Sequence, residues 1–61
     1  MPYRVIKKET ETVLAGYSFY EDAEEFFRKF RISNKRTPVQ LIKMVDDNSD
    51  AFQVLVTYLP D

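Results

Sequence analysis

The segment Ser18–Arg31, with the sequence SFYEDAEEFFRKFR, decides the fold of this chain. Its apolar residues recur at steps of four and three positions, which places them on one face of an amphipathic helix. They are Phe19, Ala23, Phe26, Phe27 and Phe30. Ser18 and Glu21 have the spacing of a capping box, which predicts where the helix begins. Acids lie in the first turns and Arg28 and Lys29 in the last, as the helix dipole favours. We therefore predict one helix that buries an aromatic face.

Length and composition predict a single small folded domain over residues 1–61. The chain is 44% hydrophobic, with nine aromatic residues, one glycine and no cysteine. A domain of this size buries only about 60% of the surface of its unfolded chain, so its stability is small. No disulfide or thiolate metal site can form without cysteine. The N-terminus leads into no apolar run and no stretch is long enough to cross a bilayer. We expect a complete, soluble, cytoplasmic protein with no signal peptide and no membrane association.

Four segments have the composition and alternation of strands. They are Tyr3–Lys8, Thr12–Tyr17, Val39–Val45 and Ala51–Leu59. We predict an α+β fold of order β-β-α-β-β, with one amphipathic helix packed on one face of a small, mainly antiparallel sheet. Gly16 is expected to mark a bend or bulge, Asn34 to adopt a left-handed conformation, and Asp46–Asp50 to form a turn. The order of the strands stays open: the helix connects the second and third strands either as a crossover or by returning to the far edge.

The second face of the sheet is the main functional signal in the sequence. Strict alternation places Val13, Ala15 and Tyr17 on one face of the second strand. On the fourth strand it separates Phe52 and Val54 from Leu55. One short helix covers one side of a sheet, so apolar residues on the other side are left to face water or a partner. The predicted partner-binding residues are Ile42, Met44, Leu55 and Leu59, or their counterparts on the other face, since the sequence leaves open which face of the third and fourth strands is buried.

The residue types needed for common catalytic and metal sites are scarce. The chain has no histidine and no cysteine, which removes the commonest general base, thiol nucleophile and zinc ligands. One glycine cannot build a phosphate-binding loop. The run Asp46–Asp50 matches a calcium loop only in part, because Ala51 and Thr57 stand where that loop needs glycine and glutamate. We predict no enzyme, no metal, no cofactor and no small-molecule substrate.

A basic segment after the middle of the helix gives an alternative function. Its members are Arg28, Lys29, Arg31, Lys35 and Arg36, with Phe30 among them. Cations beside aromatic rings are typical of single-stranded nucleic-acid grooves. However, the phenylalanines are predicted to be buried, and a pI of about 5.3 is unlike that of a dedicated nucleic-acid-binding domain. Nucleic acid is therefore the second choice of partner.

The leading hypothesis is a non-catalytic protein-binding module, a small adaptor or inhibitor that binds another protein or a second copy of itself. It would act through the open sheet face or through the hairpin edge, where the chain carries no charge from Ala51 to Leu59. The patterns Y-x-V and S-x-x-E-x-A-x-x-F within residues 3–30 resemble those of small bacterial and phage hairpin–helix modules. This resemblance names no family and assigns no functional residue, and an origin in a phage or mobile element is one option under the leading hypothesis.

Overall fold

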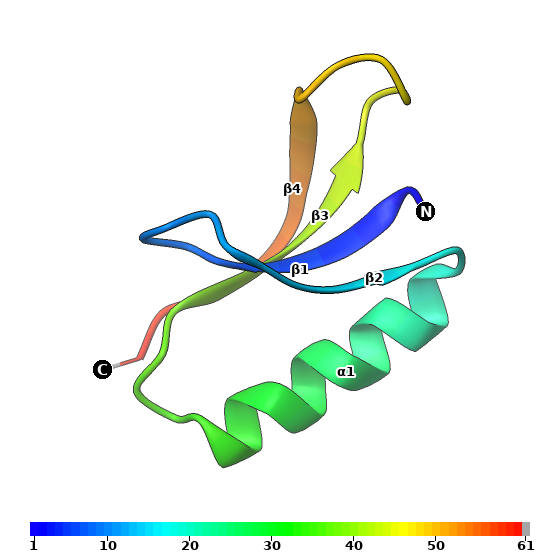
Figure 1. Cartoon of the computed structure of the whole chain (residues 1–61). Helices are drawn as coiled ribbons and strands as arrows, with labels where there is room; N and C mark the ends of the chain where they lie inside the picture. Colours follow the sequence, from blue (N-terminus) through cyan, green and yellow to red (C-terminus); the bar gives the residue numbers. More distant parts are fainter. Residues whose placement is uncertain (61) are drawn as a thin grey trace.

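The computed structural model describes residues 1–60 and has the predicted α+β architecture. Its elements are β1 (Tyr3–Lys7), β2 (Val13–Tyr17), α1 (Tyr20–Ser33), β3 (Val39–Met44) and β4 (Phe52–Tyr58). The four strands form one sheet in the order β2-β1-β3-β4, and every neighbouring pair is antiparallel. Because β1 lies between β2 and β3, α1 is a crossover that packs on one face of the sheet (Figure 1). The open question of the connection is thus settled as a crossover.

The helix packs its apolar stripe against the sheet to form the main core. The buried cluster consists of Val5, Ala23, Phe27, Val39 and Leu41. Phe26 and Phe30 are half-buried beside it, and their rings stack at a centroid distance of 5.8 Å. Burial of such aliphatic and aromatic side chains is the main favourable term in a small domain. Within residues 1–60, no helix combines the length and the apolar character needed to cross a membrane.

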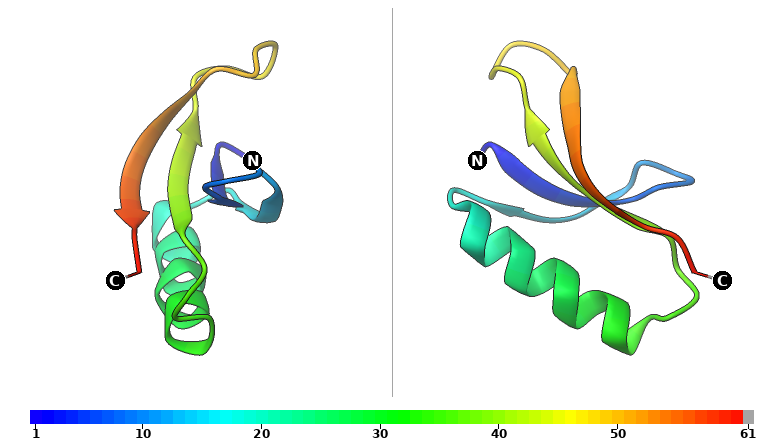
Figure 2. Two further views of the ribbon diagram at one scale, coloured as in Figure 1. Left: turned by 90° about the vertical axis from the view of Figure 1, so that its left-hand side faces the viewer. Right: turned by 180° about the vertical axis from the view of Figure 1, so that it is seen from behind.

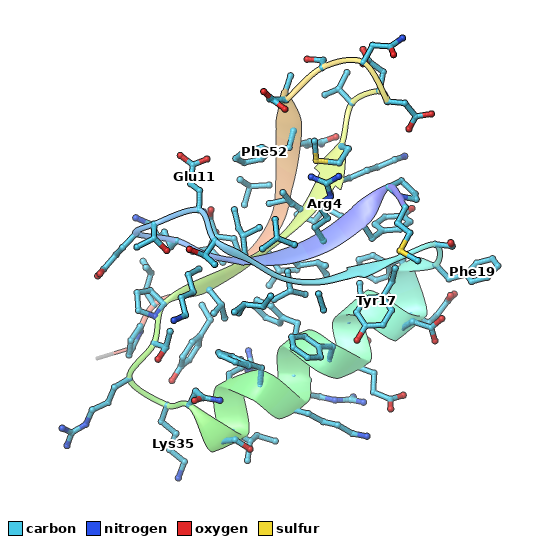
Figure 3. The ribbon with its side chains drawn as sticks, viewed as in Figure 1. Arg4, Glu11, Tyr17, Phe19, Lys35 and Phe52 are labelled. Carbon is cyan, nitrogen blue, oxygen red and sulfur yellow. The ribbon has the colours of Figure 1, made fainter. Side chains whose placement is uncertain are left out.

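Both ends of α1 differ from the expectation. The N-cap is Phe19, in an extended conformation with no side-chain cap hydrogen bond, so the predicted capping box is wrong. Phe19 lies before the first turn and is 66% exposed, away from the stripe (Figure 3). At the other end Asn34 has a φ of −131° and is not left-handed. Instead, its backbone N–H (2.8 Å) and its side-chain amide (3.1 Å) both donate to the carbonyl of Phe30.

Each edge strand contains a bulge at a leucine, which breaks the strict alternation. On β2 the register passes from Ala15 to Val13, leaving Leu14 without a partner on β1. On β4 it passes from Val56 to Val54, leaving Leu55 without a partner on β3. Both leucines pack against the main core. The bulge on β2 is at Leu14, and the expected bulge at Gly16 is wrong, since Gly16 pairs regularly with Arg4.

The bulges reverse the faces of the residues beyond them. Val13 pairs with Ile6 and Val54 with Ile42, so both valines lie on the face opposite to α1, called here the outer face. The expectation that Val13 shares a face with Tyr17 is therefore wrong. A bulge also bends its strand and increases the local twist. Accordingly, the tips of both hairpins curve away from the helix (Figure 2).

This curvature creates a second buried group on the outer face. Ile6 and Ile42 are each 2% exposed, although the helix does not cover them and neither belongs to the main core cluster. The two residues lie diagonally across the β1–β3 pair, because Ile6 is opposite Gln40. Diagonal neighbours on one sheet face are close enough for their side chains to touch. The sheet is thus apolar at its centre on both faces.

Candidate functional site

The outer face has a shallow hollow between the two hairpins, called here the outer hollow. It has a volume of about 140 Å³. It is lined by residues of all four strands and of both hairpin connections. Its lining residues are Arg4, Ile6, Glu11, Val13, Ile42, Met44, Asp50 and Phe52. The two isoleucines are its buried members, and the other six are half-buried or exposed. An apolar base with charged groups around it is the arrangement found in many protein-binding surfaces.

Arg4 is the cation of the outer hollow. It lies in the middle of β1, with Gly16 opposite on β2 and Ile42 opposite on β3. Its side chain lies on the side away from the helix, as does Phe52 (Figure 3). Among residues 1–60, no carboxylate comes within 4.0 Å of its guanidinium to form an ion pair. A half-buried arginine covers apolar neighbours with its aliphatic part and keeps five N–H donors for other acceptors.

Glu11 and Asp50 border the hollow from opposite hairpins. Glu11 has a φ of 57°, the left-handed conformation that favours glycine or asparagine. This conformation closes the β1–β2 connection, where the N–H of Glu11 donates to the carbonyl of Lys7 (2.8 Å). The N–H of Lys7 in turn donates to the carbonyl of Thr12 (2.9 Å). A glutamate in this backbone position costs free energy that a glycine would not, and such positions are enriched at functional sites.

The four predicted partner-binding residues do not form one surface. Ile42 and Met44 both lie on the outer face, where Ile42 is buried and Met44 is half-buried. Leu55 packs against the main core because of the bulge, so its predicted place on the open face is wrong. Leu59 lies beyond the end of β4 and is exposed. The outer hollow instead brings Met44 together with Arg4 and Phe52.

The predicted basic segment is divided among different contacts. Lys29 pairs with Glu25, with 2.9 Å between Nζ and Oε1. The guanidinium of Arg31 lies over the rings of Phe27 and Tyr58, at 5.8 and 5.5 Å from their centroids. Arg28 is exposed on the helix, while Lys35 and Arg36 are exposed in the connection to β3. Phe26, Phe27 and Phe30 pack in or against the main core, which leaves their faces unavailable for stacking on bases.

Two pKa shifts accompany the helix, and both lie outside the outer hollow. Burial raises the pKa of Tyr20, and the charge and hydrogen bonding of Glu24 raise it further. The ring of Tyr20 packs edge-on against Tyr3 at a centroid distance of 5.8 Å. The hydrogen bond and charge of Lys29 lower the pKa of Glu25. These shifts follow from local helix packing and ion pairing.

The run Asp46–Asp50 forms the predicted hairpin turn. The side chain of Asp46 accepts a hydrogen bond from the N–H of Asn48 (2.8 Å), and that of Ser49 accepts one from the N–H of Ala51 (3.0 Å). Short polar side chains stabilise turns in this way. Among residues 1–60, no three acidic side chains are grouped so as to hold a metal ion.

Six residues that line the outer hollow were not predicted as members of the site: Arg4, Ile6, Glu11, Val13, Asp50 and Phe52. Arg4 alternates with the core residues Tyr3 and Val5, and this alternation is the one signal that placed it opposite the helix. The position of Val13 depends on the bulge at Leu14, for which strict alternation gives no sign. Comparison of the chain with family models, with curated proteins and with solved structures found no match.

Proposed function

We propose that the protein is a non-catalytic protein-binding module, a small adaptor or inhibitor, and that the outer face contacts the partner. The observation that carries this proposal is the composition of the uncovered face. Val13 and Val54 are 50% and 42% exposed there, beside the buried isoleucines. A partner would bury both valines and offer acceptors to Arg4. Burial of apolar surface supplies most of the favourable free energy of such contacts.

The residue types support a role in binding over one in catalysis. The chain has no histidine or cysteine, and the outer hollow is lined by aliphatic and aromatic side chains with one arginine and two acids. Contacts of this kind give affinity through the apolar residues and orientation through the charged ones. A chain without cysteine suits a reducing compartment, and we propose that it acts in the cytoplasm.

A capture experiment with matched variants tests the role of the outer face. The immobilised protein, Val13→Lys and Val54→Lys are incubated with a lysate of the source cells, and bound proteins are identified by mass spectrometry. Ile32→Lys is the control, because Ile32 is 64% exposed but lies at the end of the helix. We expect one partner that is retained by the native chain and by the control, and lost by both valine variants. Equal capture by all four proteins would contradict the proposal.

A further inference from the structure

The edge strand β4 separates two oppositely charged ends of the molecule. The hairpin tip before β4 carries Asp46, Asp47 and Asp50, and all three are exposed. The end of β4 lies beside the basic connection after α1. There the hydroxyl of Tyr58 donates to the carbonyl of Lys35 (2.7 Å), and Arg31 lies over the ring of Tyr58. Between these ends the chain carries no charge from Ala51 to Pro60.

Within residues 1–60, β4 is at one edge of the sheet and has β3 as its one neighbouring strand. Its outward backbone N–H and carbonyl groups can therefore pair with another strand. Natural edges are protected by charges along the strand, by proline or by bulges. β4 has the bulge at Leu55 but no charge within the strand, since its charges are confined to the regions beyond its two ends.

We propose that β4 pairs with β4 of a second copy of this chain, antiparallel and about a two-fold axis, to form a continuous eight-stranded sheet. This arrangement brings the acidic tip of each copy to the basic connection of the other. A parallel pairing would bring like charges together at both ends. A seven-residue strand spans about 23 Å, well beyond the screening length of about 8 Å, so each end acts independently.

The bulge restricts the register of this pairing. Phe52 and Val54 lie on the outer face, whereas Val56 lies on the helix side. Paired residues of antiparallel strands point to the same face of the sheet. Same-face pairing therefore favours Val54 opposite Thr57 of the second copy, since both lie on the outer face and Leu55 then lies opposite Val56 on the helix side. Gln53 then lies opposite Tyr58 of the second copy, and the acidic tip extends past that residue toward the basic connection.

The inference goes beyond the proposed function, because it concerns the edge of β4 and not the outer face. A charge-swap experiment tests it. The tip variant carries Asp47→Lys and Asp50→Lys and keeps Asp46, whose side chain bonds the turn. The loop variant carries Lys35→Glu and Arg36→Glu and keeps Arg31 on Tyr58. Circular dichroism checks that both variants fold, and sedimentation velocity measures association.

We expect the native chain to dimerise, and each variant alone to dimerise at least about tenfold more weakly, because like charges then meet at both ends. Mixing the two variants in equal amounts should restore dimers at native affinity, since each reversed tip now meets a reversed loop. Phe19→Lys, at the exposed N-cap of α1 and outside both proposed surfaces, should dimerise like the native chain.

Three results would overturn the inference. The first is a native chain that stays monomeric at millimolar concentration, which leaves the outer-face proposal to its own capture experiment. The second is a pair of variants that dimerise as tightly as the native chain. The chain would then bind a second copy through a surface other than the edge of β4. The third is a mixture that shows no recovery although both variants are folded.

Discussion

The burial of Ile42 on the uncovered face leads to a quantitative prediction. Ile42→Val removes one methyl group from a side chain that is 2% exposed. The loss of transfer free energy for one such group is about 0.8 kcal/mol, and the small cavity raises the cost to about 1 kcal/mol. For a chain of 61 residues the free energy of unfolding is about 3–9 kcal/mol, so the variant should still fold.

Urea unfolding followed by circular dichroism measures this loss. With a slope of about 1 kcal/mol per molar urea, the midpoint should fall by about 1 M. Ile32→Val provides a matched control, since it deletes the same group from a residue that is 64% exposed. Its midpoint should stay within about 0.5 M of the native value, since surface substitutions usually change the free energy of unfolding by less than about 0.5 kcal/mol.

Equal midpoints for the two variants would refute the reasoning, because they would show that the outer face does not bury Ile42. The larger change Ile42→Ala extends the test. It should cost about 2–5 kcal/mol, which is enough to unfold a domain at the lower end of the stability range. A folded Ile42→Ala variant with a native midpoint would contradict the second buried group outright.

Three further predictions concern single contacts. Glu11→Gly should raise the free energy of unfolding, measured in urea, by about 0.5–1 kcal/mol, because glycine adopts the left-handed φ without strain. The control Glu11→Ala keeps the strain and should show no gain in the free energy of unfolding. Tyr58→Phe should lower it by about 1 kcal/mol through loss of the hydrogen bond to Lys35, and an unchanged midpoint would argue against that bond. Lys29→Met should raise the pKa of Glu25 toward its ordinary value in an NMR titration of the carboxyl carbon. Because folding lowers that pKa, the ion pair stabilises the native chain above the ordinary glutamate pKa, near 4.3, and this contribution is lost as the pH falls through the lowered value.

Periodicity predicted the elements and their order well, because the buried stripe of α1 is a strong local signal. Ala23 and Phe27 are buried as the spacing requires, and the turn at Asp46–Asp50 forms where short polar residues cluster. The ends of the helix were predicted less well. The sequence spacing of Phe19 fits the apolar stripe. However, Phe19 precedes the first helical turn, so the direction of its side chain does not follow the helical period.

The sequence could not predict which residues of β2 and β4 lie on which face of the sheet. A bulge adds one residue to a strand, and no residue type in either strand signals it. Leu14 and Leu55 both fit regular alternation by composition. In the structure both leucines pack against the main core, where they bury apolar surface at positions that have no ladder partner. The sequence therefore predicted that the sheet has an uncovered apolar face. The prediction that Leu55 belongs to this face is wrong.

The same two bulges couple the outer face to the stability of the domain. By bending β2 and β4 away from the helix, they let side chains at the rim of the outer hollow cover Ile6 and Ile42 without a second helix. Met44 and Phe52, which a partner would touch, line the same hollow as these isoleucines. A partner bound there would add to this cover and so stabilise the folded chain by mass action. Truncation of Met44 or Phe52 to alanine should weaken binding and lower the free energy of unfolding together, whereas Asp47→Lys at the tip of the β3–β4 hairpin should leave stability unchanged.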